Sequence, residues 1–178
     1  MRTTSHRFAT TLRVAVGESS LGVVLAAWSD RGLYAVQLGD DPGALRSELE
    51  RRFPGVELRA AGEELAPRLR ELLAWIEAPP GPLGMELDLR GTPLQQSVWA
   101  ALREIPAGAT ASYAEIAGRI GRARAARAVA RACAANPVAV VVPCHRVVRK
   151  DGDLSGYRWG VERKRRLLER ERHAVAAG

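Results

Sequence analysis

A proline- and glycine-rich stretch, "APPGPLG" at residues 78–84, constrains the fold of this chain more than any other feature. Proline lacks an amide hydrogen and clashes with the preceding helical turn, so the helix-like pattern of residues 63–77 must end there. A chain of 178 residues is long enough to form either one domain or two small ones. We therefore expect a first domain at residues 1–90, which includes this linker, and a second at residues 91–178.

The charges of the two halves differ in sign. Residues 91–178 contain 16 Lys and Arg against 7 Asp and Glu, a net charge of +9, whereas residues 1–90 contain 11 against 13, a net charge of −2. A basic half favours a polyanionic partner such as nucleic acid, although an ordinary surface rich in solvated arginines would give the same count.

Four classes of protein are disfavoured by the sequence. No apolar run approaches the length of a membrane span, and the first residues lack the apolar core of a signal peptide, so we expect a cytoplasmic protein without a membrane partner. Two cysteines are too few for a disulfide framework or a structural zinc site, and we expect no metal.

The first half has the pattern of an α/β domain. Residues 11–40 form apolar runs separated by the turn signals "GESS" and "SDRG", which predicts short strands. Two helices are predicted at residues 42–52 and 63–77, and the alternating "MELDL" at residues 85–89 predicts a last strand. No catalytic constellation is evident in this half.

The second half is predicted to be helical in short pieces. One helix should begin at Thr92 and run to about residue 104, and a second should begin after Ser112, with Glu115 completing a capping box. A third, at about residues 124–135, should stop before Pro137. Two short helices joined by a glycine-containing turn fit a helix-turn-helix unit.

The third of these helices, "RARAARAVARACAAN", alternates arginine with alanine and contains no acidic residue. Alanine favours helix and allows a close approach to a flat surface, whereas arginine contacts phosphates. The alternative is an alanine-rich helix packed on the core with its arginines in solvent.

The segment "VVPCHRVV" places Cys144 directly before His145. A thiolate is a good nucleophile, and a base beside it favours that form. Neighbouring side chains in an extended segment point to opposite faces, so a contact between the two would need a turn or a bridging water. The alternative is a small apolar filler, which is also how we interpret Cys133. His6 and His173 are interpreted as incidental.

The motif "PCHRVV" with "NPVAVVV" before it and "GDLSGYRWGVERKRRLL" after it resembles the O6-alkylguanine-DNA alkyltransferase family, the methylated-DNA–protein-cysteine S-methyltransferases, of the bacterial type. The resemblance is close over residues 91–171, through "GTPLQQSVWAALREIPAGATASYAEIA" and "ARAVARACAANP", and looser over the first half. It implies an RNase H-like α/β N-terminal domain and a mostly α C-terminal domain with a winged helix-turn-helix unit. The latter would be the DNA-binding and alkyl-acceptor domain.

The activity that the resemblance implies is direct-reversal DNA repair by a monomer without a cofactor. The alkyl group, mainly methyl, would pass from O6-alkylguanine, and also from O4-methylthymine, in double-stranded DNA to Cys144 in a single turnover. His145 would take the thiol proton through a water, and Glu171 would orient the imidazole, with Glu169 as the competing assignment. Asn136 would join the recognition helix to the active-site turn.

The resemblance also implies how DNA is held. The target base must leave the duplex, with Arg127 filling the gap in the stack and Tyr113 turning the nucleotide. The helix would enter the minor groove with Arg124 and the small residues Ala125, Ala126, Ala128 and Ala130.

The substrate pocket implied by the resemblance is lined or supported by Val147, Tyr157, Arg158, Trp159 and Lys164. We expect the large indole of Trp159 at its rim to favour methyl over a benzyl group, because close packing leaves little spare space.

Two other functions remain open from the sequence. One is a sensor or regulator that flips an alkylated base without chemistry, and the presence of Cys144 argues against it. The other is a Cys–His hydrolase with an incidental basic surface, which would turn over and would not need DNA.

Overall fold

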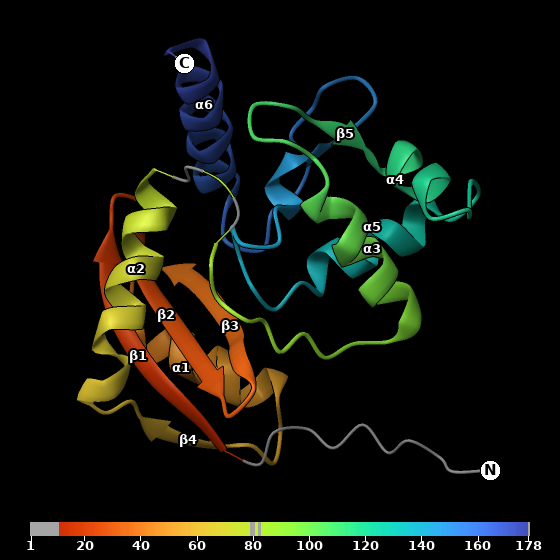
Figure 1. Cartoon of the computed structure of the whole chain (residues 1–178). Helices are drawn as coiled ribbons and strands as arrows, with labels where there is room; N and C mark the ends of the chain where they lie inside the picture. The colour runs from red at the N-terminus through yellow and green to blue at the C-terminus, as the bar shows by residue number, and fades with distance from the viewer. Residues whose placement is uncertain (1–10, 79–80, 82, 178) are drawn as a thin grey trace, which may run out of the picture. The chain divides into compact units, whose positions relative to one another are not determined.

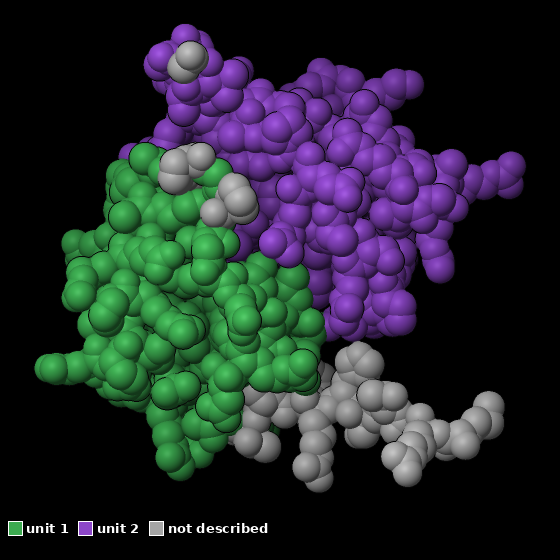
Figure 2. All heavy atoms as spheres, in the orientation of Figure 1, with its two compact units in different colours: residues 1–90 green, residues 91–178 purple. Residues whose placement is uncertain are grey.

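The computed structural model describes residues 11–78, 81 and 83–177. These residues belong to two compact units, residues 1–90 and 91–178, coloured separately in Figure 2. His6 and three prolines of the predicted linker, Pro79, Pro80 and Pro82, lie outside the described residues. Within the described part of the chain, no helix has both the length and the apolarity that a membrane span requires.

The first unit is built on a four-stranded sheet with the strand order β3-β2-β1-β4 (Figure 1). The first three strands are antiparallel neighbours and confirm the prediction for residues 11–40: β1 (Thr11–Ser19), β2 (Gly22–Ser29) and β3 (Gly32–Gly39). The edge strand β4 (Glu57–Ala60) pairs parallel to β1. Its sequence, "ELRA", is too short and too polar to signal a strand, which is why sequence analysis missed it.

Helices cover both faces of this sheet. Helix α1 (Pro42–Arg52) places Leu45 against Gly39, and α2 (Ala66–Glu77), entered through the 3-10 turn η1 (Glu63–Leu65), places Leu73 against Gly17. The strand registers put Gly17 and Gly39 on opposite faces. Strands β2 and β3 are therefore buried almost throughout, which explains their nearly continuous apolar sequence.

One predicted element of the first unit is wrong. The segment "MELDL" forms no strand; Leu87 makes only an isolated bridge with Leu33. Two hydrogen bonds hold it there, from Leu33 N to Glu86 O and from Asp88 N to Leu33 O. The Asp88 carboxylate is buried and accepts hydrogen bonds from Ser29 and Arg90. These side-chain hydrogen bonds, in addition to the two backbone bonds, hold the segment beside β3.

The second unit is mostly helical. Its helices are α3 (Pro93–Arg103), α4 (Tyr113–Arg119), α5 (Ala126–Ala134) and α6 (Val161–Ala177). Two-residue strands, β5 (Ala111–Ser112) and β6 (Val147–Val148), pair in parallel. The predicted caps, Thr92 and Ser112, are confirmed, as is the capping box of Ser112 with Glu115. Thr92 forms a second reciprocal box, with Gln95.

Helix α5 begins at Ala126, two residues later than predicted. Ala125 occupies the N-cap position and has no side chain able to accept a hydrogen bond, and a turn bonded from Ala125 N to Arg122 O precedes it. Gly121, at φ 71°, supplies the left-handed conformation in the connection from α4 to α5.

The chain between α5 and β6 makes several tight turns within the core of the second unit. Val140 has φ 69°, which is strained for a β-branched residue and costs about 1–3 kcal/mol. Short turns closed by Val141 N to Ala139 O and Cys144 N to Val142 O follow, leading into the 3-10 turn η2 (Cys144–Arg146). This path carries Cys144 and His145 on one turn that packs against α3 and α6.

Candidate active site

A cavity of about 470 Å³ lies beside Cys144 in the second unit. Its walls come from the start of α4, the end of α5, η2 and the segment before α6. The residues that line it are Tyr113, Ala130, Cys133, Ala134, Cys144, Gly156, Tyr157 and Arg158. Cys144 is a buried residue, and one part of it lines this cavity. The cavity is therefore the route by which a ligand can reach its sulfur.

Asn136 ties the end of α5 to the turn that carries Cys144. Its Nδ2 donates to the carbonyl of Val142 at 2.7 Å and to the sulfur of Cys144 at 3.2 Å, and its Oδ1 accepts from Val138 N at 2.9 Å. A donor aimed at sulfur stabilises the thiolate more than the thiol. The structure therefore brings together Asn136 and Cys144, two of the residues to which the family resemblance assigned a role.

The second cysteine lines the same cavity. Burial, with a smaller contribution from Cys144, raises the pKa of the Cys133 thiol to about 12. Cys133 therefore stays protonated near neutral pH and is a poor nucleophile. Its presence in the wall could not be read from the sequence, because the 11-residue separation from Cys144 gives no geometry.

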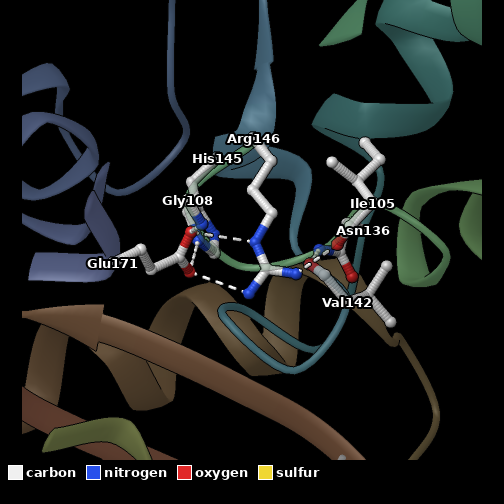
Figure 3. Close-up of polar contacts among 7 residues, drawn as sticks. All are labelled: Ile105, Gly108, Asn136, Val142, His145, Arg146 and Glu171. Carbon is white, nitrogen blue, oxygen red and sulfur yellow. Dashed lines mark hydrogen bonds and ion pairs between the residues drawn. The ribbon is translucent and has the colours of Figure 1, made fainter. Parts of the chain in front are cut away.

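A buried carboxylate holds the imidazole of His145. The Nε2 atom lies 2.7 Å from Oε1 of Glu171 in α6, and both side chains are buried (Figure 3). Glu169, the competing candidate, is exposed. Burial lowers the pKa of His145 below its ordinary value even though Glu171 opposes this shift.

The protonation of Glu171 determines the tautomer of His145. Although burial alone would raise its pKa, hydrogen bonds and charges from His145 and Arg146 lower it to about 2. An ionised carboxylate only accepts, so Nε2 of His145 must carry the hydrogen. In the neutral ring Nδ1 then carries a lone pair, and it has no hydrogen-bond partner among the described residues. His145 is therefore a base whose available nitrogen is Nδ1.

Arg146 lies in the same cluster, although no motif in the sequence indicated a role for it. Its Nε and NH2 atoms each donate to one oxygen of Glu171 at 2.9 Å, and NH1 donates to the carbonyl of Ile105 (Figure 3). The acceptor lies 25 residues away in sequence, so no local pattern could have revealed this pair.

Two tyrosines contribute differently to the cavity. The Tyr113 hydroxyl lies 2.8 Å from Oγ of Ser155, a residue held at φ 54° and not singled out by sequence analysis. The Tyr157 hydroxyl is buried and has no hydrogen-bond partner within the described residues. Burial raises the pKa of Tyr157 well above its ordinary value, so this hydroxyl is a donor, not an anion.

Three of the predicted pocket residues do not line the cavity. Lys164 is buried and donates from Nζ to the carbonyls of Val147 and Leu154, so it supports the wall from behind. Val147 lies in β6 and contributes that carbonyl. The expectation of a Trp159 indole at the rim is corrected: Trp159 as a residue is 7% exposed, belongs to the buried core and does not line the cavity. The rim position belongs to Arg158, whose Nε donates to Ala134 O at 2.9 Å.

Apart from Tyr113, which begins α4, the predicted DNA-contacting residues lie in α5 and in the two residues before it. Arg124 and Arg127 are exposed, whereas the small residues are half-buried: Ala125, Ala126, Ala128 and Ala130. Ala130 also lines the cavity, so this helix connects the basic surface with the wall beside Cys144. Over residues 11–78, 81 and 83–177, no group of three or more His, Cys, Asp or Glu is arranged to hold a metal ion.

Comparison with known proteins places these features in one family. Residues 93–173 match the family described as "6-O-methylguanine DNA methyltransferase, DNA binding domain". The chain is 51% identical over 160 residues to the bifunctional transcriptional activator/DNA repair enzyme Ada of Escherichia coli, covering 90% of this chain and 45% of that protein. The chain thus spans about half the length of the first curated relatives it matches.

Two further relatives are matched over most of their own length. The inducible methylated-DNA–protein-cysteine methyltransferase of Bacillus subtilis is 44% identical over 124 residues, covering 70% of this chain and 69% of that protein. The crystal structure of Mycobacterium tuberculosis OGT in complex with DNA superposes with a TM-score of 0.74 at 36% identity, over 92% of this chain and 94% of that one. The chain, in which Asn136 donates to the sulfur of Cys144 and Glu171 holds His145, belongs to the methylated-DNA–protein-cysteine methyltransferase family.

Proposed function

We propose that this protein repairs alkylated DNA by transferring the alkyl group of O6-alkylguanine, mainly methyl, and that of O4-methylthymine, to its own Cys144. The observation that carries the proposal is the sulfur at the wall of an open cavity, with an Asn136 donor on it and the buried His145–Glu171 pair on the same turn. Membership of the family supports it.

The proposed reaction is a single substitution at the alkyl carbon. The thiol proton passes through a water to Nδ1 of His145, the lone pair left available by the Glu171 contact. The sulfur then forms a bond to carbon while the carbon–O6 bond breaks and its electron pair stays on guanine, which takes up a proton at N1 from water. Tyr113 donates to guanine N3, and the N–H of Arg158 reaches O6. The thioether is stable, so each molecule acts once and needs no cofactor.

The proposed DNA complex uses the second unit. Helices α4 and α5, joined at Gly121, would form the helix-turn-helix of a winged unit, and α5 would lie in the minor groove. Arg127 would take the place of the flipped base, and Arg124 would contact the backbone. Residues 91–178 are thus proposed as the DNA-binding and acceptor domain, and residues 1–90 as an RNase H-like domain, within a cytoplasmic monomer.

A mass measurement tests the proposal against its two rivals. The protein is incubated with a duplex that contains one O6-methylguanine, and with the matched unmodified duplex, and then weighed intact. A gain of one methyl group on Cys144, stoichiometric with the repaired guanine, is expected. Tight binding without a mass gain would support a damage sensor, and repeated turnover without a modified protein would support a hydrolase.

A further inference from the structure

The guanidinium of Arg146 is engaged on every nitrogen. Nε and NH2 form two parallel hydrogen bonds with the two oxygens of Glu171, each 2.9 Å long, and NH1 donates to the carbonyl of Ile105 in the turn after α3. The side chain is 10% exposed. Paired bonds of this kind fix both the position and the plane of a carboxylate, which a lysine ammonium cannot do.

The Glu171 carboxylate is shared between Arg146 and His145. Oε1 accepts from Arg146 NH2 and from His145 Nε2, whereas Oε2 accepts from Arg146 Nε and, at 3.4 Å, from Gly108 N (Figure 3). A rotation of the carboxylate would break several of these bonds together. The orientation of the imidazole is therefore set by Glu171, and the orientation of Glu171 is set by Arg146.

The charges that face His145 come from two elements. Glu171 on α6 attracts a proton to the imidazole, whereas Lys164 on α6 and Arg146 on its own turn oppose protonation. Arg146 acts twice, because its charge repels an imidazolium directly and its bonds draw electron density from the carboxylate that would stabilise one.

We propose that Arg146 is a positioning residue of the proton relay, which aims the imidazole of His145 through Glu171 and keeps that imidazole neutral in the resting protein. A neutral imidazole can accept the proton of Cys144, whereas an imidazolium cannot. The inference rests on the proposed alkyl transfer for its purpose, but the coupling among the three side chains can be measured without DNA.

Two substitutions separate the charge of Arg146 from its paired hydrogen bonds. Arg146→Met removes both, so the midpoint of His145 titration should rise by about one pH unit. Arg146→Lys keeps the charge but cannot bridge both oxygens of Glu171. The midpoint of His145 titration should therefore stay, while the rate of Cys144 alkylation, measured on the plateau of its pH profile, should fall about tenfold. A residue that only supported folding would shift neither quantity in the folded protein.

The experiment records the imidazole signals of ¹⁵N-labelled protein against pH. The chain has three histidines, and a His6→Gln/His173→Gln background isolates His145. The rate of Cys144 alkylation by iodoacetamide, in a Cys133→Ala background, reports its reactivity, and methyl transfer from the O6-methylguanine duplex is measured in parallel. Arg90→Met and Arg90→Lys are matched controls, because Arg90 makes the same two-pronged contact with Asp88 in the other unit.

The outcomes distinguish this inference from the proposed function. A raised midpoint in Arg146→Met and a lowered plateau in Arg146→Lys, both absent from the Arg90 variants, support it. An unmoved midpoint, or an undiminished rate in Arg146→Lys, overturns it. If Arg146→Met does not fold, the rate of Arg146→Lys decides alone. Wild-type protein that fails to accept a methyl group refutes the alkyl transfer while the titration still tests the coupling.

Discussion

The side-chain amide of Asn136 donates to the sulfur of Cys144, 3.2 Å away, and to the carbonyl of Val142, while its own oxygen accepts from Val138 N. One side chain at the end of α5 thus satisfies two backbone groups of the following turn and places a donor on the sulfur. Its contribution to stability and its contribution to reactivity are separable.

Asn136→Asp should retain the hydrogen bond from Val138 N. It should lose the two hydrogen bonds that Nδ2 donates, to Val142 O and to the sulfur, and it should place a negative charge beside the sulfur. We expect the pKa of the Cys144 thiol to rise and its alkylation by iodoacetamide at neutral pH to slow at least tenfold. Asn136→Ala should cost about 1–3 kcal/mol of unfolding free energy, because it removes the partner of the buried Val138 N and one of the two donors to the Val142 carbonyl. Urea unfolding and the alkylation rate measure the two effects; equal reactivity of wild type and Asn136→Asp would contradict the assignment.

Cys144→Ala should abolish methyl transfer and leave DNA binding largely intact, because the exposed arginines near the start of α5, and not the thiol, supply the affinity. Cys133→Ala should retain transfer, since the pKa of Cys133, at about 12, keeps that thiol protonated. Peptide mapping of the methylated protein checks both. A methyl group found on Cys133 would reverse the assignment.

Arg127→Ala should slow repair of duplex DNA by tens of times while affecting transfer from free O6-methylguanine much less. The reason is that unstacking a base costs a few kcal/mol, and a side chain that fills the gap offsets part of that cost. Rates on the two substrates are compared with those of Arg131→Ala, an exposed arginine of the same helix. An equal loss on both substrates would mean that Arg127 serves the pocket.

The protein should lose stability in two steps as the pH falls. The folded-state pKa of His145 is lowered, so its contribution is present above the unfolded value of 6.5 and is lost below it. Glu171, with a pKa of about 2 against 4.5 unfolded, contributes about 3 kcal/mol above pH 4.5, and this is lost as the pH falls toward 2. Urea unfolding at a series of pH values measures the slope.

Glu171→Gln is the control for the acid step. It should remove the slope between pH 4.5 and 2, and it should also lower stability at neutral pH because the buried Arg146 loses its carboxylate. An unchanged slope in this variant would assign the acid step to other carboxylates.

Arg158→Ala should make the protein more sensitive to O6-benzylguanine. The Arg158 side chain lines the cavity and donates to the carbonyl of Ala134, which also lines it, so removal of the side chain should open the cavity. Trp159→Gly should instead lose about 3–5 kcal/mol of stability, because a buried indole is deleted. Inactivation rates and thermal midpoints of both variants test this. Greater benzylguanine sensitivity in Trp159→Gly alone would mean that the indole of Trp159, and not Arg158, limits the space at the cavity rim.

The sequence by itself determined the local structure wherever a cap, a breaker or an apolar run was strong enough. Thr92 and Ser112 cap their helices as predicted, and the apolar runs of residues 11–40 form the three strands. These features depend on neighbours within about four residues, which the chain order alone specifies. The same holds for the motif around Cys144, which was sufficient to indicate the family.

Only the tertiary structure decided which side chains meet. The choice of Glu171 over Glu169, the hold of Arg146 on that carboxylate, the place of Cys133 in the cavity wall and the burial of Trp159 all depend on how α6 and α5 pack around η2. These contacts join residues that are far apart along the chain. Because packing and burial are properties of the assembled core, no local pattern of residues could specify them.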